Sequence, residues 1–232
     1  MQLFYSPDAS PSTFTLDADE SRHCLRVLRK KTGDHIDVVD GKGNLYHAEI
    51  TGDKGKLCEM KTISVEKEYC KRHYKVSVGI ALPKNNERFE WFLEKATEIG
   101  IDTIYTILTK RAEKKKVNLE RCRKIIISAM KQSGKAYLPE IKEPTKLSDI
   151  ISISEKQKFI AVCGMEDIQH LKDAYQKGMN ALVIIGPEGD FTEEEVDLSI
   201  ANGFVPVSLG RSRLRVETAG VVACHAINLL NE

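Results

Sequence analysis

The sequence has no long apolar run and no closely spaced pair of cysteines. Its longest apolar runs, such as Ala181–Ile185, are far shorter than the roughly 20 residues that a membrane-spanning helix requires. Residues 1–14 hold no cationic start followed by an apolar stretch, so we expect no secretory signal. The six cysteines lie 12 or more residues apart, which argues against a zinc site and a disulfide framework. We therefore expect a soluble cytoplasmic protein with reduced thiols and no bound metal.

An excess of charge of one sign is also missing from the chain as a whole, but not from its parts. The 232 residues carry a net charge of +1, with 41% hydrophobic and 30% charged residues, which excludes disorder as the main state. The balance is zero over residues 1–72, +6 over 73–150 and −5 over 151–232, with +8 inside 110–135 alone. Such a basic stretch can attract a polyanion, or it can be the solvated face of a helix.

The hydrophobic pattern changes near residue 70. Before it, short alternating strands at 2–5, 35–40, 45–50 and 57–63 surround one amphipathic helix at 19–29, which suggests a small β-barrel domain over 1–70. From 74 to 232, strands at 75–82, 103–108, 158–163, 181–185 and 205–209 alternate with helices at 87–99, 118–132, 167–177, 192–202 and 217–230. This alternation predicts an α/β domain with a parallel sheet covered on both faces.

A first candidate site follows the apolar strand that ends at Ile185. Two glycines, Gly186 and Gly189, allow close approach to the backbone, and Thr192 with Glu195 forms a capping box that starts the next helix. The loop lacks the lysine of a P-loop and the spacing of a dinucleotide fingerprint. Its carboxylates suit a ligand with a positive centre better than a phosphate. A tight structural turn is the alternative reading.

A second candidate site lies about twenty residues further on, again where a strand meets glycine and a helix. Here Gly210 is followed by three arginines at 211, 213 and 215, in an otherwise acidic segment. These cations need either a bound anion or a carboxylate, and Glu217 is the nearest carboxylate in the sequence. The alternative is an Arg–Glu network that closes the start of the last helix.

The two loops, IGPEG-x-F-T-x-x-E at 185–195 and LG-x-x-x-LR-x-ETA at 209–219, resemble signatures of the bacterial 16S ribosomal RNA uridine-N3 methyltransferases. This family belongs to the SPOUT superfamily of knotted methyltransferases. Three further stretches agree, namely HCLRVLR at 23–29, the segment 84–100 that ends in KATEIG, and Gln132-Ser133 with Pro139-Glu140-Ile141. The matches span residues 23 to 219. Departures from the family pattern occur at Asp190, where a second glycine is usual, and at Ser212-Arg213.

The resemblance implies a SPOUT domain with a deep trefoil knot, a PUA-like N-terminal barrel, and a homodimer. It implies methylation of uridine N3 in 16S rRNA of the small ribosomal subunit, with S-adenosylmethionine as cofactor. The expected catalytic residues are Arg215, which stabilises the anion that forms on the base, and Glu188 as general base. The expected cofactor site consists of Gly164, Ile185, Gly186, Gly189, Leu209, Gly210 and Leu214. The side chains expected to contact RNA are Arg22, Arg26, Arg29, Lys84, Arg88, Lys110, Arg111, Lys114, Lys115 and Lys135.

Several alternatives remain open at this point. The chain could modify another RNA, or it could be a non-catalytic RNA-binding or ribosome-assembly factor with the same fold, which the Asp190 departure would favour. A small-molecule α/β enzyme is a third possibility that the basic stretch disfavours. Asp190 could crowd the cofactor loop or contact the cofactor's amine. The final helix, apolar at Val221, Val222, Ala223, Ala226, Ile227 and Leu230, could be a dimer face or could be buried in its own domain.

Overall fold

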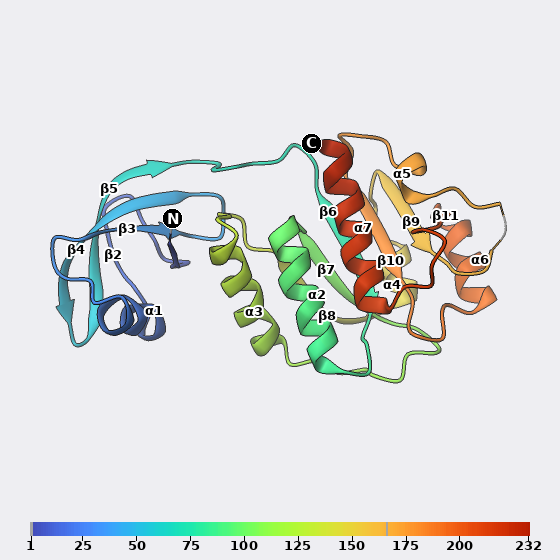
Figure 1. Cartoon of the computed structure of the whole chain (residues 1–232), viewed down its shortest axis with the longest axis horizontal. Helices are drawn as coiled ribbons and strands as arrows, with labels where there is room; N and C mark the ends of the chain where they lie inside the picture. The colour runs from blue at the N-terminus through green and yellow to red at the C-terminus, as the bar shows by residue number, and fades with distance from the viewer. Residues whose placement is uncertain (1, 166) are drawn as a thin grey trace. The chain divides into compact units, whose positions relative to one another are not determined.

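The computed structural model describes residues 2–165 and 167–232, which form two compact units (Figure 1). The first unit contains Met1–Lys71 and Ile127–Leu138, and the second contains Arg72–Ile126 and Pro139–Glu232. The first unit therefore includes a short segment from the middle of the sequence, in addition to the N-terminal region. No helix among the described residues is both long and apolar enough to cross a membrane.

The first unit is built on a mixed five-stranded sheet with the order β1-β3-β4-β5-β2. The pair β1 and β3 is parallel, and the other pairs are antiparallel. Two short helical segments follow one another on this sheet, and the second is a π-helix. The bounds are β1 (Leu3–Tyr5), β2 (Thr13–Thr15), α1 (Ala18–Arg22), η1 (His23–Val27), β3 (His35–Val39), β4 (Leu45–Lys54) and β5 (Leu57–Glu66).

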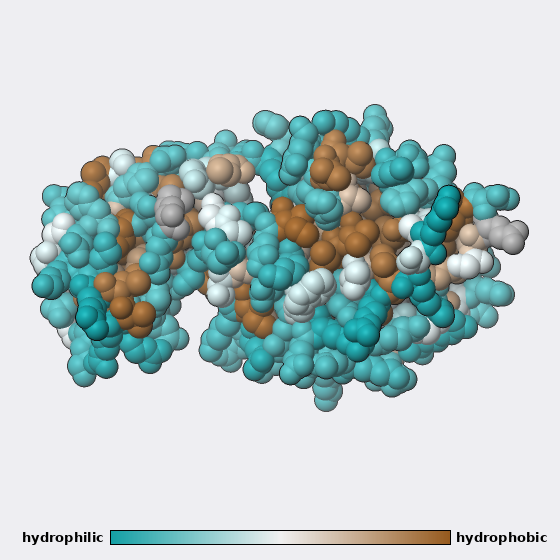
Figure 2. Space-filling model, viewed as in Figure 1, coloured by the Kyte–Doolittle hydropathy of each residue, from teal (hydrophilic) through white to brown (hydrophobic). Residues whose placement is uncertain are grey.

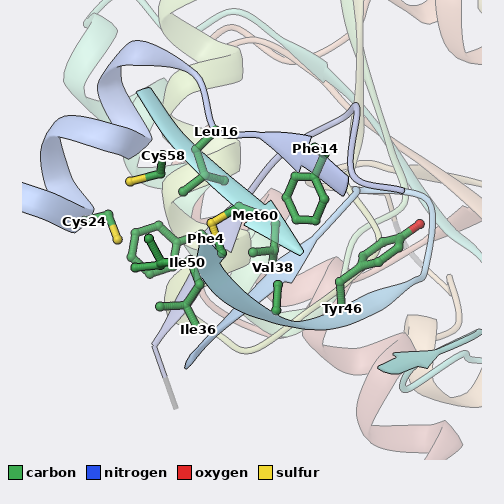
Figure 3. Close-up of a cluster of buried hydrophobic side chains, with 11 residues drawn as sticks. Phe4, Phe14, Leu16, Cys24, Ile36, Val38, Tyr46, Ile50, Cys58 and Met60 are labelled. Carbon is green, nitrogen blue, oxygen red and sulfur yellow. The ribbon is translucent and has the colours of Figure 1, made fainter. Parts of the chain in front are cut away.

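The strands of this sheet bury alternate side chains in a hydrophobic core, which agrees with the alternating pattern of the sequence. Every second side chain of the strands turns inward, so that Phe4, Val38, Ile50 and Met60 pack together with at most 1% exposure (Figure 3). The predicted single helix at 19–29 is instead split into α1 and η1. The side chain of Asp17 accepts a hydrogen bond from the Glu20 amide and so starts α1.

The segment Ile127–Leu138 joins the first unit through a second, smaller core. Met130 and Ala136 are buried against Leu3, Val39 and Leu45 of the sheet. Within the same unit, the Lys131 ammonium group pairs with the carboxylate of Glu20, which is also largely buried. The C-terminal part of helix α3 (Leu119–Gln132) is thus held by both apolar and charged contacts.

The second unit contains an all-parallel six-stranded sheet with the order β11-β9-β10-β6-β7-β8. Its strands are β6 (Val76–Ala81), β7 (Thr103–Leu108), β8 (Glu140–Lys146), β9 (Gln157–Ala161), β10 (Ala181–Ile185) and β11 (Val205–Val207). Its other helices are α2 (Asn86–Ile99), α4 (Leu147–Ile151), α5 (Leu171–Ala174), α6 (Glu193–Ala201) and α7 (Val216–Asn231). The predicted α/β class and parallel sheet are confirmed, with exact bounds for β7 and β10.

Helices cover both faces of this sheet, so that its two middle strands, β6 and β10, are buried along their whole length. On one face, α7 approaches so closely that a Cβ atom on Gly220 would lie 2.6 Å from the Phe92 ring of α2. On the other face, α4 packs with Leu182 and Ile184 in a separate cluster. Figure 1 shows α2 and α7 side by side, and Figure 2 shows hydrophobic surface in the region where they lie.

Besides the helix at 19–29, one expected element was wrong and two strands were not expected. The helix predicted at 167–177 is reduced to α5, because Gln169 and Leu171 form backbone hydrogen bonds with Ser208 and hold the chain extended there. The strands β2 and β8 were missed, and both lie at sheet edges. β8 has the sequence EIKEPTK, and an edge strand tolerates such polar side chains and a proline because only one side of it is paired.

Candidate active site

Three loops of the second unit meet at one edge of its sheet. The strands β11, β9 and β10 are parallel neighbours, so their carboxyl ends lie side by side. The loops that follow them, at 162–165, 186–191 and 208–215, line a cavity of about 1100 Å³. Ligands of open parallel sheets bind at this edge, in pockets of roughly 300–1,000 Å³. The cavity is therefore the candidate active site.

The loop 186–191 is firmly attached to the fold on its C-terminal side. The predicted capping box is confirmed, since the Glu195 amide donates to the Thr192 hydroxyl and the Thr192 amide donates to the Glu195 carboxylate. The other oxygen of Glu195 accepts a hydrogen bond of 2.7 Å from the Lys110 amide. Glu195 is buried, so these contacts fix the start of α6 beneath the loop.

Two charged side chains hold the tip of the same loop. The Arg111 guanidinium donates to the carbonyl oxygens of Gly189, at 2.7 Å, and of Phe191, at 3.2 Å. The Asp190 carboxylate accepts one hydrogen bond from the Phe191 amide, at 2.8 Å, and one from the Cys163 amide, at 3.0 Å. The second of these bonds joins the loop after β10 to the loop after β9.

The loop 208–215 is far less constrained. The Ser208 hydroxyl and the backbone of Gly210 share hydrogen bonds of 3.1 Å, and Gly210 has a positive φ of 129°. Residues 211–213 are exposed, and no hydrogen bond is described for residues 211–214. Arg215 occupies the N-cap position of α7 but makes no capping hydrogen bond with its side chain.

The predicted cofactor residues all line the cavity. They are Gly164, Ile185, Gly186, Gly189, Leu209, Gly210 and Leu214. The predicted catalytic residues Arg215 and Glu188 line it as well. Glu188 is exposed, and its carboxylate accepts a hydrogen bond of 3.2 Å from the Lys84 amide. The structure thus brings together residues from loops that are up to 53 residues apart in the sequence.

Glu217 was missed as a wall of the cavity. The sequence suggested it as a partner of the arginines at 211–215, but its carboxylate faces Arg88 of α2, with an N–O distance of 3.8 Å. Its side chain is only 8% exposed. Arg88, Arg215 and Glu217 also line a smaller hollow of about 390 Å³, next to the exposed Trp91. The LR-x-ETA match contains Glu217, but only the fold reveals its partner on another helix.

The basic side chains predicted to contact RNA fall into several groups. Arg22, Arg26 and Arg29 are exposed in the first unit, where Arg22 also pairs with Asp19. Others are engaged inside the second unit: Lys84 pairs with Glu113, Lys110 with Glu194, Arg111 binds the cavity loop, and Lys114 bonds to Asn86. Lys115 is exposed, while Lys135 lies partly buried in the segment that belongs to the first unit.

The chemical character of the cavity excludes some mechanisms. Cys163 is exposed at its surface, but partial desolvation by the surrounding protein, and then the nearby Asp190 carboxylate, raise the pKa of its thiol, which therefore stays protonated and is a poor nucleophile near neutral pH. Among the described residues, no group of three or more His, Cys, Asp or Glu side chains is arranged to hold a metal ion. The lining instead mixes arginines, carboxylates and the apolar Ile185, Leu209 and Leu214.

Comparisons with known proteins agree with this architecture. A family model described as an RNA methyltransferase domain matches residues 70–228, and one described as an RNA methyltransferase PUA domain matches residues 16–61. The ribosomal RNA small subunit methyltransferase E of Synechocystis sp. is 33% identical over 229 residues, which cover 95% of this chain and 74% of that relative.

Two solved structures are similar over the whole chain. One is a probable rRNA-methyltransferase from Porphyromonas gingivalis, 39% identical with a TM-score of 0.94, covering 100% of this chain and 98% of that one. The other is a ribosomal RNA small subunit methyltransferase E from Neisseria gonorrhoeae bound to S-adenosyl methionine, 26% identical with a TM-score of 0.83, covering 100% and 98%.

The fold and the matches define an RNA methyltransferase with an N-terminal PUA domain. Within this class, the chain belongs to the ribosomal RNA small subunit methyltransferase E family.

Proposed function

We propose that this chain transfers the methyl group of S-adenosylmethionine to N3 of a uridine in the rRNA of the small ribosomal subunit. As a member of its family, the chain is an rRNA methyltransferase that depends on S-adenosylmethionine. The observation that carries the proposal is the cavity in which three strand-end loops bring the predicted cofactor glycines together with Arg215. The choice of uridine N3 rests on the motif resemblance at 185–195 and 209–219.

The residues around the cavity fit this cofactor. S-adenosylmethionine, when bound, supplies the methyl group, and it carries an adenine ring, a sulfonium, an ammonium and a carboxylate. The apolar side chains of Ile185, Leu209 and Leu214 can cover the adenine, and the backbone of Gly186, Gly189 and Gly210 can approach it closely. Carboxylates and arginines on the same walls match the charges of both signs. A phosphate-rich ligand would meet Glu188, Asp190 and Glu193 instead.

The chemical role of the chain is to turn a weak nucleophile into a stronger one. Uridine N3 carries a proton, and its electron pair attacks the methyl carbon only as that proton leaves, so negative charge develops on the imide. Arg215 would stabilise this charge from the cavity wall, an interaction whose removal typically costs about 100- to 1000-fold in rate. Alignment of base and methyl group supplies much of the remaining acceleration.

Two carboxylates are candidates for the proton acceptor. Glu188, the residue suggested by sequence, is exposed and accepts a hydrogen bond from the Lys84 amide. Glu217 is buried and lies near Arg88 on a wall shared by the large cavity and the smaller hollow. Glu188→Gln and Glu217→Gln distinguish the two, because only loss of the true acceptor changes the pH dependence of kcat.

Binding of RNA would use exposed cations of both units, including Arg26, Arg29 and Lys115. The target base must be unstacked to enter the cavity, as in other enzymes that modify a single base. A homodimer would use α7, although its residues Ala223 and Ile227 are fully buried inside the second unit. Val221, Val222 and Ala226 stay partly exposed, and Leu229 is 54% exposed. The trefoil knot and a cytoplasmic location remain predictions.

The test uses small subunits from cells that lack the gene for this chain. The subunits are incubated with the protein and S-adenosylmethionine, digested to nucleosides, and analysed by mass spectrometry. The proposal predicts a new 3-methyluridine peak that forms about 100-fold or more slowly with Arg215→Ala. A different methylated nucleoside would refute the assignment to N3. No methylation of subunits or of bulk RNA would favour the non-catalytic RNA-binding factor.

A further inference from the structure

Asp190 has a backbone conformation that glycine adopts at a lower cost. Its φ angle is 61°, in the left-handed region that glycine adopts freely and other residues adopt at a cost. The turn itself does not require an aspartate, since a glycine would adopt the same backbone conformation without strain. The side chain of Asp190 must therefore contribute something that offsets the strained backbone.

The contribution is a pair of hydrogen bonds that only a carboxylate can accept at once. One oxygen accepts from the Phe191 amide within its own loop, at 2.8 Å. The other oxygen accepts from the Cys163 amide in the loop after β9, 27 residues away, at 3.0 Å. An ionised carboxylate offers two acceptors and no donor, and its hydrogen bonds are stronger than those of neutral groups.

Among the described residues, the loop that receives this bond makes few other hydrogen bonds. Val162 donates to Val207 of β11, but Cys163 and Met165 are exposed and Gly164 has a φ of 74°. For residues 163–165, the bond to Asp190 is the hydrogen bond that the structure describes. On its other side, loop 186–191 is anchored by Arg111 and Glu195. Asp190 therefore ties the loop at 162–165 to the anchored loop at 186–191.

We propose that Asp190 is a positioning residue that clasps the loops after β9 and β10 and so preforms the cofactor cavity. This inference rests on the proposed use of S-adenosylmethionine. A preformed site binds more tightly because the ligand does not have to order the loop on arrival. Asp190 thus acts through Cys163 and its neighbours.

Two substitutions separate this role from a merely structural one. Asp190→Gly removes the clasp but also removes the backbone strain, so the melting temperature should stay equal or rise while the Kd for S-adenosylmethionine rises about tenfold. Asp190→Asn tolerates the left-handed conformation and keeps an acceptor for Phe191. It places an amide donor against the Cys163 amide, so its Kd should rise by a similar factor.

The matched control is Glu68→Gly, which removes an acidic residue with a φ of 52° in the first unit, far from the cavity in sequence. It should match Asp190→Gly in thermal stability and leave the Kd unchanged. Calorimetry gives the Kd, and NMR hydrogen exchange reports the Cys163 amide, which should lose protection in both Asp190 variants but not in the control.

Wild-type affinity together with a protected Cys163 amide in Asp190→Gly would overturn the proposal. Loss of affinity with unchanged exchange at Cys163 would also overturn it, since the clasp would then not be the cause. If the wild-type chain binds no S-adenosylmethionine, the proposed function fails first. If it binds the cofactor but makes no 3-methyluridine, the clasp stands and only the reaction is reassigned.

Discussion

The loops 186–191 and 208–215 resemble each other in sequence but differ in structure. Both follow a parallel strand, contain glycine and lead into a helix. The first is tied down by Arg111, by the Asp190 carboxylate and by a complete capping box. The second has exposed residues at 211–213 and no described hydrogen bond at 211–214. One wall of the cavity is therefore tied to the fold by several hydrogen bonds, and the other has few of them among the described residues.

The charges of the second loop are consistent with the lack of described hydrogen bonds at residues 211–214. Arg211, Arg213 and Arg215 alternate along a short segment, and like charges at such spacing repel one another. Glu217, the carboxylate closest in sequence, is turned towards Arg88. An anion that develops on the substrate would satisfy these arginines. We infer that loop 186–191 offers the cofactor a fixed wall, whereas loop 208–215 adds cofactor contacts through Leu209, Gly210 and Leu214 and places Arg215 towards the substrate.

The largest expected effect concerns Arg215, at the end of the open loop. Arg215→Ala should lower kcat by about 100-fold or more, because charge on the base is then unsupported, while the Kd for S-adenosylmethionine changes little. Rapid-quench measurements of methyl transfer together with calorimetry separate the two quantities. Arg211→Ala serves as the matched comparison, because it removes an arginine from the exposed part of the same loop. If Arg215→Ala weakened the binding of S-adenosylmethionine as strongly as it lowered kcat, the proposed role of Arg215 towards the substrate alone would be contradicted.

The next effect concerns Arg111 and the rigid loop. Arg111→Ala removes hydrogen bonds to the carbonyls of Gly189 and Phe191, and should raise the Kd for S-adenosylmethionine about ten- to thirtyfold. Lys115→Ala removes a neighbouring exposed cation and should leave that Kd unchanged. If Arg111→Ala instead weakens RNA affinity and its salt dependence alone, Arg111 is an RNA contact, as its place in the basic stretch first suggested.

A smaller effect should distinguish the glycines of the two loops. A Cβ atom on Gly189 would lie 3.5 Å from Arg111, which is an ordinary contact. Gly189→Ala should therefore leave the melting temperature nearly unchanged. Gly210 has open space around it but a φ of 129°, so Gly210→Ala should cost about 1–3 kcal/mol of local strain. Because its loop is open, that strain should weaken cofactor binding and leave the melting temperature almost unchanged. A large drop in melting temperature for Gly210→Ala would show that the loop is structurally rigid.

The smallest effect concerns the capping box. Thr192→Ala removes the acceptor for the Glu195 amide and should cost about 1 kcal/mol, which lowers the melting temperature by roughly 2–4 °C. The start of α7 has no such cap, so Arg215→Ala should not lower the melting temperature in this way. Differential scanning calorimetry on both variants makes the comparison, and equal destabilisation would contradict it.

Local signals explain which parts of the molecule could be predicted. The bounds of β10 follow from its unbroken apolar run, and the start of α6 follows from Thr192 and Glu195 only three positions apart. The contacts that shape the cavity were not predictable in this way. Arg111 reaches a loop 78 residues away, and Asp190 reaches one 27 residues away. Asp190 was visible in the sequence only as a departure from the family pattern, which indicated its position but not its partner.

The central claim is that one cavity loop is ordered in the free protein and the other becomes ordered on binding. Amide hydrogen exchange, followed residue by residue with and without S-adenosylmethionine, tests this most directly. We predict that the Phe191 and Glu195 amides are protected in the free protein, whereas those of Arg211–Arg213 exchange rapidly and slow down only when ligand is bound. Equal exchange rates for both loops in the free protein would contradict the account.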